Sequence, residues 1–255
     1  MRRLALSATA AAILLAPTFS EAQELGERVR RAPDGWVRFM FEGREGICGH
    51  ERGGISFRRD RDHDYGDWTC EEGPVRVELR VRDARIRDID VEVAGGWDRR
   101  SGVVTDLGAV SPREASDALF DIAETAEEDV AKDAIFPATM GRGVESWPRL
   151  LEIARGHRSR DVRRQAVFWL GQEASERATE GLTSIIEDDG ELEVREHAIF
   201  ALSQRHEEPA AFETLMRLAR SSPEPSLRRT AIFWLGQSDD PRVLELLEEI
   251  LTRGG

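Results

Sequence analysis

Carboxylates between residues 60 and 71 are the first candidates for chemistry, because they have part of the spacing of a calcium loop. Asp60, Asp62 and Asp64 occupy loop positions 1, 3 and 5, and Glu71 occupies position 12. Tyr65 stands where the sharp turn of such a loop needs glycine, and the flanking stretches resemble strands rather than helices. We therefore favour a solvated, charged hairpin tip over a calcium site, and we predict neither a metal nor a cofactor.

The first 22 residues have the pattern of a secretory signal peptide. Arg2 and Arg3 precede an apolar run, Leu4–Pro17, which is too short for an ordinary membrane span, and small residues surround a cleavage site after Ala22. An N-terminal membrane anchor is the competing interpretation, which the shortness of the run disfavours. No later stretch approaches about 18 apolar residues. We expect a periplasmic or secreted protein without a membrane span in its mature chain.

Export gives a meaning to the two cysteines, Cys48 and Cys70. An even number of cysteines in an oxidising compartment predicts a disulfide. The bond would close a loop of about 20 residues, which stabilises by about 3 kcal/mol in the chain-entropy model. Metal and redox pairs use closer spacing such as C-x-x-C, which the sequence lacks. We therefore expect a Cys48–Cys70 disulfide.

One eleven-residue stretch recurs in the C-terminal half, at 162–172, 194–204 and 227–237, with steps of 32 and 33 residues. Its skeleton is V-R-x-x-A-x-x-x-L-[GS], with Leu227 in place of the first Val, and a degenerate copy begins at Val130. A second helical stretch lies before each of the three long copies, and one more follows the last copy. These stretches have apolar residues at corresponding places, namely Leu150, Leu182, Leu215 and Leu247. A two-helix unit at this period predicts an α-solenoid, in which stacked units share one core.

This skeleton resembles the HEAT repeat, in particular the short HEAT-like repeats named after phycobiliprotein lyases. The resemblance covers about residues 112–252. It implies stacked helical hairpins and a binding role. It implies no lyase activity, because no motif for a tetrapyrrole accompanies it. In the first copy Pro137 takes the place of Trp169, so that helix is expected to be short or kinked. It is also expected to face the β-domain that residues 36–95 predict, as described below.

Two further rows of residues recur beyond the packing skeleton. On a helical wheel Ala166, Trp169 and Leu170 fall on the core face, whereas Phe168 falls on the polar face. The aromatic row consists of Phe136, Phe168, Phe200 and Phe233, and the glutamine row consists of Gln172, Gln204 and Gln237. The two rows form either a groove that binds a peptide or a seam that fills the space between repeats. A third row, Arg163, Arg195 and Arg228, is expected to tie loops and neighbouring repeats together, with Asp161 and Glu193 as partners, rather than bind an anion.

The remaining chain divides by its period. Residues 23–35 are polar and are expected to be a loose lead-in. Residues 36–95 alternate apolar and polar side chains, most clearly at Val75–Arg82, and predict a small antiparallel β-domain with one solvated face. Residues 96–110 are rich in glycine and are expected to be a connector. Residues 111–255 are expected to form the HEAT-like α-solenoid, with about four repeats and a capping helix.

These features favour an exported, non-enzymatic scaffold or adaptor that binds another protein or peptide. The alternative is a small-ligand or calcium-dependent binding protein that acts through the β-domain. An enzyme is disfavoured because G-x-S-x-G, H-E-x-x-H, G-x-x-x-x-G-K and C-x-x-C-H motifs are absent. Nucleic acid is disfavoured as a partner because the net charge is −13, with 49 acidic and 36 basic residues.

Overall fold

The computed structural model describes residues 21–50, 54–57, 71–173, 175–205 and 208–253. The first 20 residues, the three aspartates of the acidic loop and Cys70 lie outside this part of the chain. The signal peptide, the metal loop and the disulfide therefore stay predictions, although Cys48 is buried on its strand.

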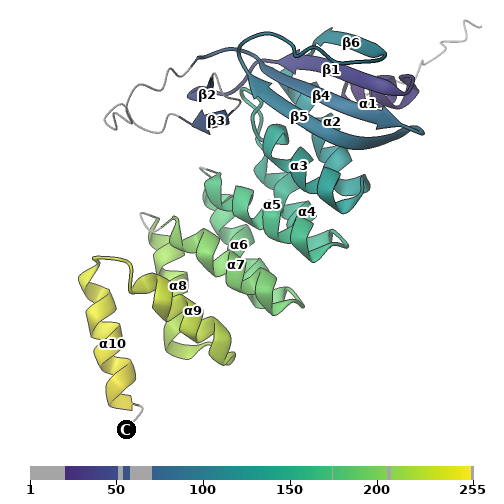
Figure 1. Cartoon of the computed structure of the whole chain (residues 1–255). Coiled ribbons are helices and arrows are strands. Elements are labelled where there is room, and N and C mark those ends of the chain that lie inside the picture. Colours follow the sequence, from purple (N-terminus) through teal and green to yellow (C-terminus); the bar gives the residue numbers. More distant parts are fainter. Residues whose placement is uncertain (1–20, 51–53, 58–70, 174, 206–207, 254–255) are drawn as a thin grey trace, which may run out of the picture.

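A four-stranded sheet lies at one end of a long stack of helices (Figure 1). Its strand order is β5-β4-β1-β6. The strands are β1 (Gly35–Phe41), β4 (Val75–Arg82), β5 (Arg85–Val93) and β6 (Val104–Ala109). Strand β4 pairs antiparallel with β1 and with β5, as the alternation predicts. Strands β2 (Ile47–His50) and β3 (Gly54–Phe57) form a separate antiparallel pair.

Two stretches expected to be irregular are elements of this domain. Residues 96–110 contain β6, which pairs parallel with β1, so the sheet is mixed rather than purely antiparallel and extends beyond the expected boundary at 95. Residues 23–35 belong mostly to helix α1 (Glu21–Arg31), whose Leu25 and Val29 are buried. Each stretch offers few apolar residues, which gives a weak periodic signal.

The β4–β5 hairpin has a two-residue turn and a bulge. Asp83 and Ala84 both have positive φ, 53° and 55°, as a two-residue type I′ turn requires. The register shifts between Arg80 and Val81, whose partners are Asp88 and Ile86, so Arg87 is the extra residue.

The charged face of the sheet is less solvated than expected. Arg76 and Glu78 are only 6% and 5% exposed. The segment after β5 covers them: Arg100 donates a hydrogen bond to Glu78 at 2.9 Å, and the Arg76 guanidinium lies 5.5 Å from the centre of the Trp97 ring. The opposite, apolar face carries Val37, Phe39 and Leu79, which are buried, as predicted.

The helices pair as hairpins in chain order, and four such hairpins and one final helix occur in the described part of the chain (Figure 1). The hairpins are α2 (Pro112–Thr125) with α3 (Glu128–Ala138), α4 (Trp147–Gly156) with α5 (Arg160–Gln172), α6 (Glu176–Asp188) with α7 (Leu192–Ser203), and α8 (Pro209–Ser221) with α9 (Pro225–Leu235); α10 (Pro241–Arg253) follows. The amide of Glu114 donates to Ser111 Oγ at 3.1 Å, so Ser111 caps the start of α2. None of the helices described here is long and apolar enough to cross a membrane.

The first hairpin packs against the sheet, as expected for an atypical first repeat. Helix α3 contacts β5 and ends one residue after Pro137. Backbone hydrogen bonds extend from β1 into the loop after α3, from the Arg44 amide to the Met140 carbonyl at 2.7 Å and from the Arg142 amide to the Glu42 carbonyl at 3.1 Å. The buried side chains of the sheet and of the helices form one continuous core.

The second helices α5 and α7 approach each other closely at Gly171. A Cβ atom at this position would lie 2.8 Å from Cβ of Ala201 on α7. We expect Gly171→Ala to lower the free energy of unfolding by about 1–3 kcal/mol through overpacking. The control is Gly156→Ala, because Gly156 is also the last or nearly last residue of a helix but has no atom within 4 Å of the added Cβ. Urea unfolding that ranks Gly156→Ala as the more harmful change would contradict this account.

Candidate functional site

The second helices of the hairpins, α3, α5, α7 and α9, lie next to one another and bring the aromatic row together. Val162, Ala166 and Leu170 of α5 are fully buried, which fixes the rotation of the helix about its axis. This rotation leaves Phe168 at the edge of the core, half-buried. The corresponding residues of α7 and α9 repeat the arrangement, so the aromatic row follows one side of the solenoid.

The aromatic row is partly packing and partly exposed surface. Phe136, Phe168 and Phe200 are half-buried, whereas Phe233 is 59% exposed. Phe136 stacks on Trp169 of the next repeat, with ring centres 4.3 Å apart and planes at 11°. Phe200 lies 4.9 Å from Trp234 of the next repeat. The row therefore combines packing between repeats with solvent exposure, because the phenylalanine rings are only partly covered by their contacts.

The tryptophans of the F-W pairs are part of this surface, which the wheel did not anticipate. Trp169 was expected on the core face, but it is half-buried, as is Trp234. Phe168 packs edge-on against Trp169 at 5.1 Å, and Phe233 packs edge-on against Trp234 at 5.0 Å. The sequence feature that could have indicated this is the F-W dipeptide, which occurs in the first and third long copies.

The second copy interrupts the row, because Ala201 occupies the position of the tryptophan. Ala201 is 2% exposed and lies against Gly171. No tryptophan from α7 therefore covers Phe168. The aromatic residues separate into a proximal cluster, Phe136, Trp169 and Phe168, and a distal cluster, Phe200, Trp234 and Phe233.

The glutamine row lies at the carboxyl ends of the same helices. Gln172 is half-buried, and Gln204 and Gln237 are exposed. Gln204 is the C-cap residue of α7, and Gln237 follows α9, where its backbone amide donates to the Trp234 carbonyl at 3.1 Å. An amide side chain offers both a donor and an acceptor. The two rows thus place hydrogen-bonding groups beside accessible aromatic rings.

The arginine row ties each first helix to the second helix of its own repeat. Arg163 donates to the His157 carbonyl at 3.0 Å, Arg195 to the Ile186 carbonyl at 2.6 Å, and Arg228 to the Ser222 carbonyl at 2.6 Å. These carbonyls belong to the ends of α4, α6 and α8, where helix carbonyls lack intrahelical partners. The row is structural.

His197 is a titratable group beside the distal cluster. Its ring lies 5.7 Å from that of Phe200. Burial lowers the pKa of His197, and the nearby Arg164 guanidinium lowers it further, so the imidazole is favoured in its neutral form. The neutral ring adds no charge to an otherwise aromatic surface.

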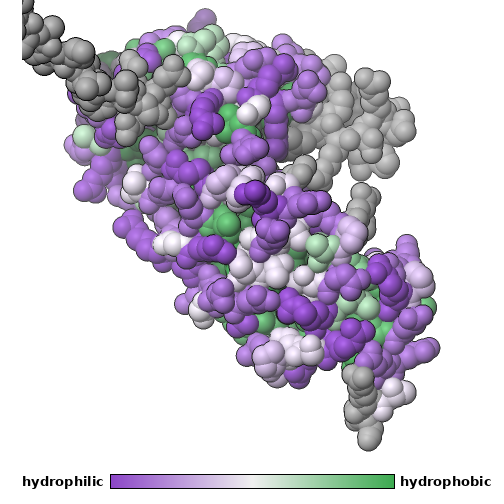
Figure 2. Space-filling view, turned by 180° about the vertical axis from the view of Figure 1, so that it is seen from behind, coloured by the Kyte–Doolittle hydropathy of each residue, from purple (hydrophilic) through white to green (hydrophobic). Residues whose placement is uncertain are grey.

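Hydrophilic residues dominate the face of the molecule shown in Figure 2, and its apolar residues form small, separate patches.

The fold and the two rows define an α-solenoid of helical hairpins with aromatic clusters along its second helices. Residues 147–211 and 179–254 match the model of HEAT repeats. Residues 147–254 therefore form HEAT-like repeats, and the match extends neither to the first hairpin, α2 with α3, nor to the sheet. No protein of curated function matches the chain.

Truncation of the aromatic residues should separate packing from exposed surface. We expect Phe200→Ala to lower the free energy of unfolding by about 2–3 kcal/mol, because it removes a half-buried ring from Trp234. Phe233→Ala should cost only about 0.5 kcal/mol, as for other exposed positions. Urea unfolding followed by circular dichroism measures both. Equal losses would show that the distal cluster does not divide in this way.

Proposed function

We propose that the protein is an exported, non-enzymatic adaptor that binds a segment of another protein through the aromatic clusters of its HEAT-like solenoid. The observation that supports this most directly is Phe233, which is 59% exposed although Phe136 and Phe200 of the same row help to join the repeats. Exposed aromatic side chains contribute little to stability and much to protein interfaces.

The chemistry around the distal cluster suits a polypeptide with apolar side chains. Phe233 and Phe200 offer aromatic faces, while Gln204 and Gln237 offer exposed amides that can pair with the donors and acceptors of a peptide backbone. The chain carries a net charge of −13, which favours association with a basic partner. The proposed partner is therefore a segment that combines apolar anchors with basic residues.

Site-specific photo-crosslinking tests the proposal. A photoreactive phenylalanine analogue at position 233 should give discrete adducts with envelope proteins, whereas the same analogue at Glu180, an exposed residue of the first helix α6, should not. Phe233→Ala should then weaken binding of the identified partner at least about fivefold. The same adducts at both positions, or full affinity in Phe233→Ala, would exclude this surface.

Export has its own test, based on the apolar run at Leu4–Pro17. We expect the protein recovered from the cell envelope to begin at Gln23 and to contain a Cys48–Cys70 bond, which intact-mass measurement detects as the loss of two hydrogens. A control chain that lacks residues 1–22 should stay in the cytoplasm with reduced thiols. Two free thiols in the exported protein would contradict the disulfide, and an uncleaved chain would contradict the signal peptide.

A further inference from the structure

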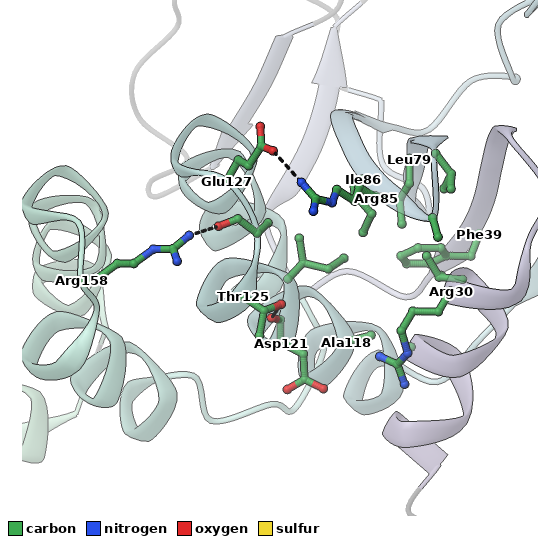
Figure 3. Close-up of a pocket in the computed structure, with 16 residues that line it drawn as sticks. Arg30, Phe39, Leu79, Arg85, Ile86, Ala118, Asp121, Thr125, Glu127 and Arg158 are labelled. Carbon is green, nitrogen blue, oxygen red and sulfur yellow. Dashed lines mark hydrogen bonds and ion pairs between the residues drawn. The ribbon is translucent and has the colours of Figure 1, made fainter.

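A cavity of about 420 Å³ lies on the apolar face of the sheet, between α1, the β4–β5 hairpin and α2 (Figure 3). Phe39, Leu79 and Val81 line it from the sheet, Val29 from α1, and Ala118 and Ile122 from α2. Its volume falls in the range of small-molecule sites, about 300–1,000 Å³. Phe39, Leu79 and Ala118 are at most 3% exposed, so they form the closed floor of the cavity, and the partly exposed Ile86 and Ile122 supply accessible apolar surface above it.

The inner wall of the cavity selects an apolar occupant. The side chains of this wall named above are all hydrocarbon, so they offer no partner for a buried polar group. A polar group placed among them would lose its hydrogen bonds to water without replacement. Water is a poor occupant for the same reason, because it needs several polar partners. An alkyl chain of matching size has no hydrogen bonds to lose on entry.

The rim is charged, and its arginines come from three separate elements. Arg30 belongs to α1, Arg85 to the hairpin and Arg158 to the loop after α4, and Figure 3 shows them around the apolar side chains. The side chains of Arg30 and Arg85 are 62% and 67% exposed. They contrast with the negative charge of the chain as a whole.

The ion pairs at the rim leave these arginines open to exchange. Arg30 pairs with Glu27 at 2.9 Å on its own helix, and Arg85 lies 3.7 Å from Glu127, whose closer partner is Arg87 at 3.1 Å. Exposed pairs of this kind contribute little free energy. The other acid of the rim, Asp121, is held by Arg149 at 2.9 Å. An incoming anion therefore meets guanidinium groups whose present partners are weakly held.

We propose that this cavity binds a single-chain amphiphile with an anionic headgroup, such as a medium-chain carboxylate. The alkyl chain lies over this floor, against the partly exposed Ile86 and Ile122, and the carboxylate lies at the rim beside Arg85. The cavity is too small for the two chains of a phospholipid, which favours a free carboxylate over a lipid of a membrane surface. The assignment does not depend on the proposed binding of a protein by the distal cluster.

Calorimetric titration of the mature protein with sodium decanoate below its micelle concentration tests this site. Wild-type protein should bind one equivalent. Ala118→Trp, which fills the cavity, should reduce affinity at least about tenfold. Because this variant is buried and can disturb folding, Arg85→Glu provides a second test at the exposed rim. It should weaken decanoate binding roughly threefold to tenfold and leave binding of neutral decanol unchanged.

The matched control is Arg217→Glu, which makes the same charge change at an exposed arginine of α8. This variant should bind decanoate as the wild type does. The proposal is overturned by absence of decanoate binding, by normal binding in folded Ala118→Trp, or by an equal loss for decanol in Arg85→Glu. Binding to anionic phospholipid vesicles without binding to decanoate would overturn it in favour of a membrane surface. Ala118→Trp should leave crosslinking at position 233 intact, so failure here is distinguishable from failure of the adaptor proposal.

Discussion

No helical hairpin of this protein can cover its own apolar surface, and the rest of the structure follows from that constraint. Each repeat relies on its neighbour: Ala201 closes against Gly171, and Trp169 and Trp234 are covered by phenylalanines of the preceding repeat. The first repeat has no preceding hairpin, so it packs against β5 instead. The backbone hydrogen bonds between residues 42–44 and 140–142 fix this junction. The sheet therefore acts as the first layer of the stack.

The sequence predicts the repeated parts well because the same physical requirement is written several times. The V-R-x-x-A-x-x-x-L skeleton locates helices α5, α7 and α9, and the strict alternation at Val75–Arg82 locates β4. Elements that occur once and bury few side chains escape this reasoning. Helix α1 buries Leu25 and Val29, and β6 is held mainly by backbone pairing with β1. Neither leaves a periodic trace that a single sequence can display.

The candidate surfaces were predictable to different degrees. The aromatic row was visible as four equivalent phenylalanines, but its division into two clusters depends on which tryptophan each ring meets across a repeat boundary. The cavity beside the sheet was not visible at all, because α1, the hairpin and α2 are far apart in sequence and its lining consists of ordinary core residues.

The alanine at position 201 determines the valency of the solenoid surface. A tryptophan there would join the aromatic residues into one continuous strip, on which an apolar segment could slide from repeat to repeat. With Ala201 the two clusters are separate, and in the proposed adaptor they are two distinct anchoring points. A partner that carries two anchors at the matching separation gains from the high effective concentration of the second contact, whereas a partner with one anchor does not. The methyl side chain of Ala201 would thereby make the surface select partners by the separation of their anchors.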